Sequence, residues 1–193
     1  MRIAASIILA SASPRRKQLL AEAGYKFKVA KPNIGESAFP AGDVNPCEYA
    51  KRLALAKAKN VAESYPDCVV IGADTVVDFD GQIIGKAADA EDAERITRKL
   101  FSQPHKVITG VAIVRQSDGV EIVESDTTVV FPKKMNDEQM AEHIRNESWR
   151  DKAGAYAIQE SGDEFVERIE GSLTNVMGLP MELLQQMLGR IID

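Results

Sequence analysis

Short apolar segments alternate with capped helical segments along the chain, and this order is the feature that most restricts its fold. The first such unit occupies residues 6–24. Its apolar run 6–10 predicts a buried strand. Ser13 then suits a helix N-cap, Pro14 suits the first helical position, and Gly24 suits the helix stop. Alternation of this kind predicts an α/β fold.

The same rules predict the remaining elements. Further strands are expected at 27–30, 68–71, 76–77, 107–116, 120–131 and 165–169. Further helices are expected at 46–64, 89–100, 137–146 and from 180 onward. The turn signals Asp80-Gly81 and Ser117-Asp118-Gly119 place two hairpins in the middle of the chain. We therefore expect an α/β fold with a mixed central sheet and flanking helices, formed as a single domain over residues 1–193.

The charge balance argues against one class of partner, nucleic acids. The net charge is −5 and aromatic residues make up 6% of the chain. Duplex binding needs a basic face, and single-strand binding needs a basic groove with aromatic platforms. We expect no nucleic-acid partner, although a local cationic pocket for one small anion stays open.

The beginning of the chain and its two cysteines point to a cytoplasmic protein. The apolar run 3–10 is too short to span a membrane and is followed by arginines without a cleavage pattern. We expect no membrane partner. Cys47 and Cys68 are too few for a disulfide framework or a zinc site, so reduced core thiols are expected.

The segment SASPRR at residues 11–16 is the most informative one. A strand that leads into a capped helix start is a site for anions, because free N–H groups and the helix dipole point there. Arg15 and Arg16 lie in the first turn, where the dipole disfavours cations. Ser11, Ser13 and the arginines together suit a polyphosphate. A solvated helix start with surface arginines is the alternative.

Several charged residues are ambiguous when taken singly. Asp74 ends an apolar strand, which is a common place for a metal ligand or a general base, and also for a turn-capping Asp. Lys57, Lys86 and Glu36 could each be an ordinary solvated side chain.

Three other residue types give weaker signals. His105 and His143 lack a matching nucleophile or ligand spacing, so a Ser-His-Asp triad or a histidine metal site is poorly supported. Trp149 suits a loop anchor better than a base-stacking residue, with stacking left open. The chain also lacks a Walker-type loop and a Rossmann fingerprint.

Taken together, these segments resemble the Maf family of nucleotide pyrophosphatases over nearly the whole chain. The motifs that carry the resemblance are LASASPRR at 9–16, Glu36, LAKA at 55–58, GADTVV at 72–77, Gly85-Lys86, and the segments 105–111, 149–159 and 171–180. Each motif alone is weak, whereas the ordered set is specific.

The resemblance implies a two-lobed fold related to the inosine triphosphate pyrophosphatases, with a nucleotide cleft and a divalent metal, Mg²⁺ or Mn²⁺. Asp74 falls on the catalytic proton acceptor of the family. The polar active-site positions fall on Ser11, Arg16, Glu36, Lys57 and Lys86. On this basis Asp74, Lys57 and Lys86 are the expected catalytic residues, and Glu36 and Asp74 the expected metal ligands. A homodimer is the family expectation.

Arg15, Thr75 and Gln159 indicate the subfamily. They resemble the branch that acts on dTTP and UTP, whereas the 7-methyl-GTP branch has Trp, Gln and Glu there. Substrate contacts are accordingly expected from Ser11, Ser13, Arg15, Arg16, Thr75 and Gln159. The chain departs from the family pattern at Ala87 and Glu160, which concerns the geometry of two loops. A non-catalytic nucleotide-binding regulator of cell division is the alternative function.

Overall fold

The computed structural model describes residues 6–34, 39, 44–147, 149–150, 152–156 and 165–191. Its strands are β1 (Ile7–Ala10), β2 (Phe27–Ala30), β3 (Val69–Phe79), β4 (Gln82–Ile84), β5 (His105–Arg115), β6 (Val120–Pro132) and β7 (Val166–Glu170). Its helices are α1 (Pro14–Glu22), α2 (Pro46–Ala62), α3 (Ala90–Leu100), α4 (Asp137–Arg145), α5 (Leu173–Val176) and α6 (Met181–Leu188), with one 3-10 turn at Gln116–Asp118. The expected α/β class is thus confirmed.

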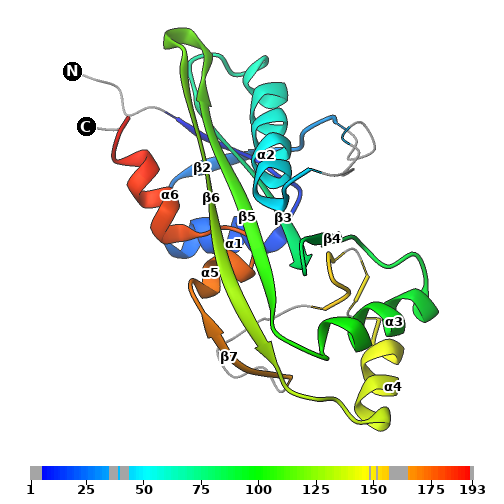
Figure 1. Ribbon diagram of the computed structural model, residues 1–193. Helices are drawn as coiled ribbons and strands as arrows, with labels where there is room; N and C mark the ends of the chain where they lie inside the picture. Colours follow the sequence, from blue (N-terminus) through cyan, green and yellow to red (C-terminus); the bar gives the residue numbers. More distant parts are fainter. Residues whose placement is uncertain are drawn as a thin grey trace.

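The strands form one mixed sheet in the order β2-β1-β3-β5-β6-β7, with β4 paired to β3. The first three strands in this order are parallel, and the pairs that involve β5, β6 and β7 are antiparallel. The strands β5 and β6 run the length of the molecule (Figure 1). Both expected hairpins, β3–β4 and β5–β6, are present.

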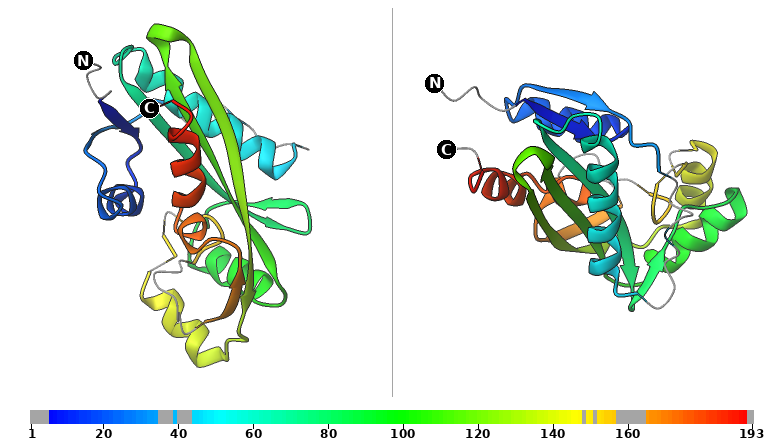
Figure 2. Two further views of the ribbon diagram at one scale, coloured as in Figure 1. Left: turned by 90° about the vertical axis from the view of Figure 1, so that its left-hand side faces the viewer. Right: turned by 90° about the horizontal axis from the view of Figure 1, so that it is seen from above.

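Helices cover both faces of the sheet, as the side view in Figure 2 shows. The helix α2 packs on one face, where Ala54 and Ala58 contact the even-numbered strand residues Val70 and Ala112. The helices α1 and α6 pack on the other face against odd-numbered residues such as Ile71. This division follows from the alternation of side chains along a strand.

Two of the hydrophobic core groups lie toward opposite ends of the sheet and give the molecule two lobes. One group surrounds Ile71 and Ile113 beneath α1 and α6. The other joins Val77 and Val107 to α3 and the Trp149 region. Because β3 and β5 contribute to both groups, the two lobes share one sheet, and we retain the single domain as our interpretation.

The structure corrects two expectations about the elements. The sequence suggested a break between 68–71 and 76–77, but β3 is continuous, because residues Val70–Asp78 all pair with β5. The short helix α5, capped by the Ser172 hydroxyl, was not expected.

Two further expectations concern the cysteines and the helices. Cys47 and Cys68 are free thiols but half-buried rather than in the core. Within the described part of the chain, each helix falls short of the length or the apolar character that a membrane span requires.

Candidate active site

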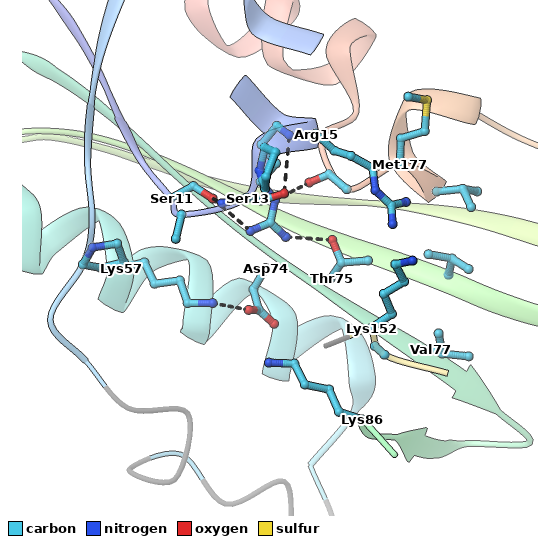
Figure 3. Close-up of a pocket in the computed structure, with 18 of the residues that line it drawn as sticks. Ser11, Ser13, Arg15, Lys57, Asp74, Thr75, Val77, Lys86, Lys152 and Met177 are labelled. Atoms are coloured by element: carbon cyan, nitrogen blue, oxygen red, sulfur yellow. Dashed lines mark hydrogen bonds and ion pairs between the residues drawn. The ribbon is translucent and has the colours of Figure 1, made fainter. Parts of the chain in front are cut away.

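A cavity of about 930 Å³ lies between the two lobes at one edge of β3. Its walls come from residues far apart in sequence: 11–16, Lys31, Pro32, Ile34, Lys57, Asp74, Thr75, Val77, Lys86, Val107, Arg150, Lys152, Ala153, Tyr156 and 176–178. Figure 3 shows their side chains converging on this space. The cavity therefore brings together most segments that the sequence singled out.

The edge of β3 explains why the cavity forms there. On this edge β3 pairs with β1 as far as Gly72 and with β4 from Val77 onward. The intervening residues 73–76 have no strand partner on that side among the residues that the structure describes. Asp74 and Thr75 lie in this gap, while β5 holds the opposite edge of the strand along its length.

The start of α1 forms one wall of the cavity. Ser13 is the N-cap, and its hydroxyl accepts a hydrogen bond from the Arg16 N–H at 3.5 Å. The Ser11 hydroxyl accepts from the Ser13 N–H at 3.1 Å. The helix thus presents its N-terminal end to the cavity, as expected for an anion site.

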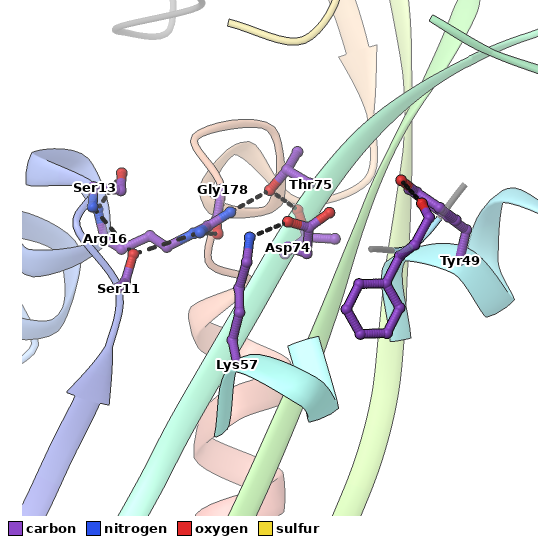
Figure 4. A network of polar contacts seen from close by, with 10 residues as sticks. Ser11, Ser13, Arg16, Tyr49, Lys57, Asp74, Thr75 and Gly178 are labelled. Carbon is purple, nitrogen blue, oxygen red and sulfur yellow. Dashed lines mark hydrogen bonds and ion pairs between the residues drawn. The ribbon is translucent and has the colours of Figure 1, made fainter. Parts of the chain in front are cut away.

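Arg15 and Arg16 differ in their surroundings. The Arg16 guanidinium donates from Nε to the Gly178 carbonyl oxygen at 2.7 Å and from Nη2 to the Thr75 hydroxyl at 3.0 Å (Figure 4). Its Nη1 also lies 3.5 Å from the Ser11 hydroxyl. Arg16 therefore ties α1 to β3 and to the residues after α5, whereas Arg15 extends toward the cavity (Figure 3).

Lys57 and Asp74 form an ion pair in the cavity wall, with 2.5 Å between Nζ and Oδ1. Their side chains are only 12% and 8% exposed. The pair depends on a close approach between α2 and the sheet, which two glycines permit. A Cβ at Gly72 would lie 2.3 Å from the Ala54 carbonyl oxygen, and one at Gly110 would lie 2.4 Å from the backbone of Ala50. Glycine at these positions therefore brings Lys57 within reach of Asp74.

Lys86 and Lys152 enter the cavity from the opposite lobe. An isolated β-bridge joins Lys86 to Ala153, and the Gly154 N–H donates to the Gly85 carbonyl oxygen at 3.1 Å. Burial lowers the pKa of Lys152, and the nearby Arg15 guanidinium lowers that pKa further. Burial also lowers the pKa of Arg15. Two cations held close together favour an anion between them.

The cavity is strongly basic although the whole chain is acidic. Its described lining holds seven basic residues: Arg15, Arg16, Lys31, Lys57, Lys86, Arg150 and Lys152. Asp74 is the single acidic residue in the same lining. An excess of this kind suits a ligand that carries several negative charges, such as a polyphosphate.

The aromatic residues near the cavity have mostly structural contacts. Trp149 is buried and its Nε1 donates to the Ile144 carbonyl oxygen at 3.1 Å, which supports the loop-anchor interpretation. His105 Nδ1 lies 3.1 Å from the Leu100 carbonyl oxygen. Its Nε2 lies 2.5 Å from the hydroxyl of Tyr156, which lines the cavity. Burial lowers the pKa of His105, so the neutral ring accepts from Tyr156 and donates to Leu100.

The expected site residues fall into two groups. Ser11, Ser13, Arg15, Arg16, Lys57, Asp74, Thr75 and Lys86 all line the cavity. Glu36 and Gln159 lie outside the described residues. The sequence did not single out Lys31, Arg150, Lys152 or Tyr156, although the last three belong to the 149–159 motif. The available signal for these three residues was two basic side chains, Arg150 and Lys152, close to Tyr156 in the sequence.

The donor set bears on the expected metal. Within the described ranges, His, Cys, Asp and Glu side chains nowhere gather in a group of three or more that could enclose an ion. Asp74 is thus one carboxylate among cations. This set fits an ion that is held mainly by substrate phosphates, as Mg²⁺ commonly is, rather than by a protein cage.

Comparisons with known proteins show the family to which the chain belongs. The family model described as Maf-like protein matches residues 6–191. The dTTP/UTP pyrophosphatase of Citrifermentans bemidjiense is 47% identical over 176 residues, which cover 91% of this chain and 90% of that protein. The dTTP/UTP pyrophosphatase of Symbiobacterium thermophilum is 42% identical over 94% of this chain and 92% of its own length.

A solved structure supports the fold. The Staphylococcus aureus Ham1 protein superposes with a TM-score of 0.53 at 15% sequence identity, over 95% of this chain and 98% of that one. The two proteins therefore share their fold despite low sequence identity.

Proposed function

We propose that this chain, which belongs to the family of Maf-like proteins, hydrolyses dTTP and UTP to the nucleoside monophosphate and pyrophosphate. The observation that carries the proposal is one buried carboxylate, Asp74, in a cavity with seven basic residues. The names of relatives at 42% and 47% identity give the same activity.

The basic residues are assigned to the phosphates. The α1 N-terminus and Arg15 would bind phosphate oxygens from one lobe, and Lys86 and Lys152 from the other. Neutralising the charge of the triphosphate lowers the repulsion that an attacking water oxygen meets at phosphorus. The same cations stabilise the charge that develops on the leaving pyrophosphate.

Asp74 is assigned to the activation of water. Lys57 contacts its Oδ1 and fixes the orientation of the carboxylate, so we assign the proton transfer to Oδ2. The water oxygen forms a bond to the α-phosphorus as its proton passes to Asp74. The bond from the α-phosphorus to the oxygen that bridges it to the β-phosphorus breaks, and the electron pair leaves with pyrophosphate.

A divalent ion would be held by Asp74 together with phosphate oxygens, and Glu36 is the predicted second carboxylate. When bound, Mg²⁺ or Mn²⁺ supplies positive charge at the phosphate oxygens. The many basic residues in the wall would share this task.

Base preference is assigned to Gln159 with Thr75 and Arg15. A glutamine amide offers one donor and one acceptor, which match O4 and N3–H of uracil and thymine. Thr75 and Arg15 both line the cavity, and this supports the assignment for two of the three residues.

One experiment separates this proposal from a non-catalytic regulator of cell division. Purified protein is incubated with dTTP, UTP, CTP or 7-methyl-GTP, with Mg²⁺, Mn²⁺ or EDTA, and the products are identified by phosphorus NMR. We expect pyrophosphate and monophosphate from dTTP and UTP, and much less of both from the Asp74→Asn variant. Tight binding of UTP without turnover would favour the regulator. Release of inorganic phosphate and a nucleoside diphosphate would refute cleavage at the α-phosphorus.

A further inference from the structure

A buried row of hydrogen bonds lies behind Thr75. The Thr75 hydroxyl lies 2.9 Å from the hydroxyl of Thr109 on β5, directly across the β3–β5 pair. The Thr109 hydroxyl donates to the Asn175 carbonyl oxygen at 3.0 Å. Thr109 and Asn175 have no exposed surface, so these groups cannot exchange their partners for solvent.

The direction of each hydrogen bond in this row is determined by proton count. A hydroxyl has one proton, and that of Thr109 is donated to Asn175. Thr109 must therefore accept from Thr75, whose own proton is used in that bond. Thr75 also accepts from Arg16 Nη2 at 3.0 Å. The row runs in one direction, from Arg16 through Thr75 and Thr109 to Asn175.

A second connection leads from Asn175 back to Arg16. The Asn175 Nδ2 donates to the Val107 carbonyl oxygen at 3.0 Å and to the Thr128 hydroxyl at 2.9 Å, which fixes α5 on the sheet. Gly178 follows α5, and its carbonyl oxygen accepts from Arg16 Nε at 2.7 Å. The hydroxyl of Thr109 thus helps to hold two acceptors of the Arg16 guanidinium, the Thr75 hydroxyl and the Gly178 carbonyl oxygen.

We propose that Thr109 is a positioning residue of this site, which acts through Thr75 and Asn175 to fix Arg16. Thr109 also makes the Thr75 hydroxyl an acceptor toward the cavity. Thr75 has one lone pair left for a ligand there, because its only proton is already donated to Thr109. Thr75 therefore cannot donate to phosphate oxygens, which are acceptors, and faces a hydrogen-bond donor of the substrate. The inference rests on the proposed function only for its activity readout.

The test is a double-mutant cycle between Thr75 and Thr109. The variants are Thr75→Val, Thr109→Val, the pair, and Thr109→Ser, which retains the hydroxyl. The readouts are kcat/KM for UTP, the Kd of the non-hydrolysable α,β-methylene analogue of UTP, and the midpoint of urea unfolding. Thr97→Val is the matched control, since Thr97 is equally buried but donates to Ala93 within α3.

We expect Thr109→Val to lower kcat/KM and analogue affinity about tenfold, the scale of one lost hydrogen bond. Thr109→Ser should stay within about twofold of wild type, because the hydroxyl remains. Thr97→Val should retain activity. In the Thr75→Val background, Thr109→Val should lower kcat/KM and analogue affinity by less than about threefold, because the Thr75 hydroxyl through which Thr109 acts is already absent.

Two results would overturn the proposal. One is a folded Thr109→Val protein with wild-type affinity and activity. The other is a double variant whose loss of activity equals the product of the losses in the two single variants, which would show that Thr109 does not act through Thr75. If wild-type protein releases no pyrophosphate from any triphosphate, the proposed function is refuted but the role of Thr109 is not. The double-mutant cycle is then judged on the Kd of the analogue alone.

Discussion

Nζ of Lys57 lies 2.5 Å from Oδ1 of Asp74, although the two residues belong to different elements, α2 and β3. Neither side chain is more than 12% exposed. In such a site the charge of one partner determines the environment of the other, because little water is present to screen it. The pair is therefore the part of the cavity where substitution should affect chemistry most directly.

Replacing Asp74 tests its role as a general base. Asp74→Asn retains the shape of the side chain but cannot accept a proton, so we expect the turnover of UTP to fall by at least ~10². The control is Asp78→Asn on the same strand, because Asp78 is also buried but accepts from the Gly81 N–H in the β3–β4 turn. Initial rates of pyrophosphate release measure both. Near wild-type turnover in folded Asp74→Asn would remove Asp74 from the mechanism.

Substitutions of Arg16 separate charge from geometry. Lysine keeps the charge but cannot donate in one fork to the Gly178 carbonyl and the Thr75 hydroxyl. We expect Arg16→Lys and Arg16→Ala each to weaken the binding of UTP and CTP by at least about tenfold. High salt screens charge, so the loss of affinity should become smaller at high salt only by the part that is due to the charge of Arg16.

Calorimetric Kd values for the non-hydrolysable α,β-methylene analogues of UTP and CTP and for pyrophosphate measure the effect of the Arg16 variants. The exposed Arg95, which pairs with Asp92 on α3, supplies the control Arg95→Lys. Full affinity in Arg16→Lys would mean that charge alone is required. A changed base preference with unchanged pyrophosphate affinity would mean that Arg16 contacts the base.

Base preference is the test for Gln159. Cytosine reverses the donor and acceptor of uracil, and an unpaired buried polar group costs roughly 1–3 kcal/mol. CTP should therefore be turned over at least ~10-fold less efficiently than UTP or dTTP. Gln159→Ala should reduce this ratio more than it lowers the best rate, whereas Gln185→Ala, on the exposed side of α6, should change neither. The measurement is kcat/KM for UTP, dTTP, CTP and 7-methyl-GTP in wild type and both variants. A preference of the wild type for 7-methyl-GTP would refute the subfamily assignment.

The buried His105 should make stability depend on pH. Burial lowers its pKa in the folded protein, so the unfolded chain binds a proton more readily. The free energy of unfolding should then fall as pH drops below the ordinary histidine pKa of about 6.5, until the folded-state pKa is reached. Urea unfolding between pH 5 and pH 8 measures this slope at roughly half-unit intervals. In His105→Gln the slope should be smaller, and an equal slope would assign the pH dependence to other groups.

Local signals predicted most of the elements correctly. The serine cap and the first-position proline of α1 and the glycine turns of both hairpins act within a few residues, so their effect is visible in the sequence. The continuity of β3 was missed because it depends on pairing with β5, more than thirty residues away. The helix α5 is too short for a periodic pattern, and only its Ser172 cap could have indicated it.

The site was predictable in part for the same reason. Ser11, Arg15 and Asp74 belong to compact motifs, and the structure places them around one cavity. Lys152 was missed because its position depends on the bridge between Lys86 and Ala153, which joins distant segments. The roles assigned to these residues, the divalent ion and the homodimer stay predictions.

The two glycines beneath α2 also limit how this protein can evolve. A Cβ at Gly72 would lie 2.3 Å from the Ala54 carbonyl oxygen, so any larger residue displaces the helix turn that carries Lys57. A mutation that alters this packing also shifts Lys57 relative to Asp74, so we expect selection to act on the packing and on the ion pair together. Lys152, Ala153 and Tyr156 line the cavity from the other lobe, on a segment separate from α2. New substrate ranges in this lineage should therefore arise through that segment, while the helix and the sheet beneath it stay the same.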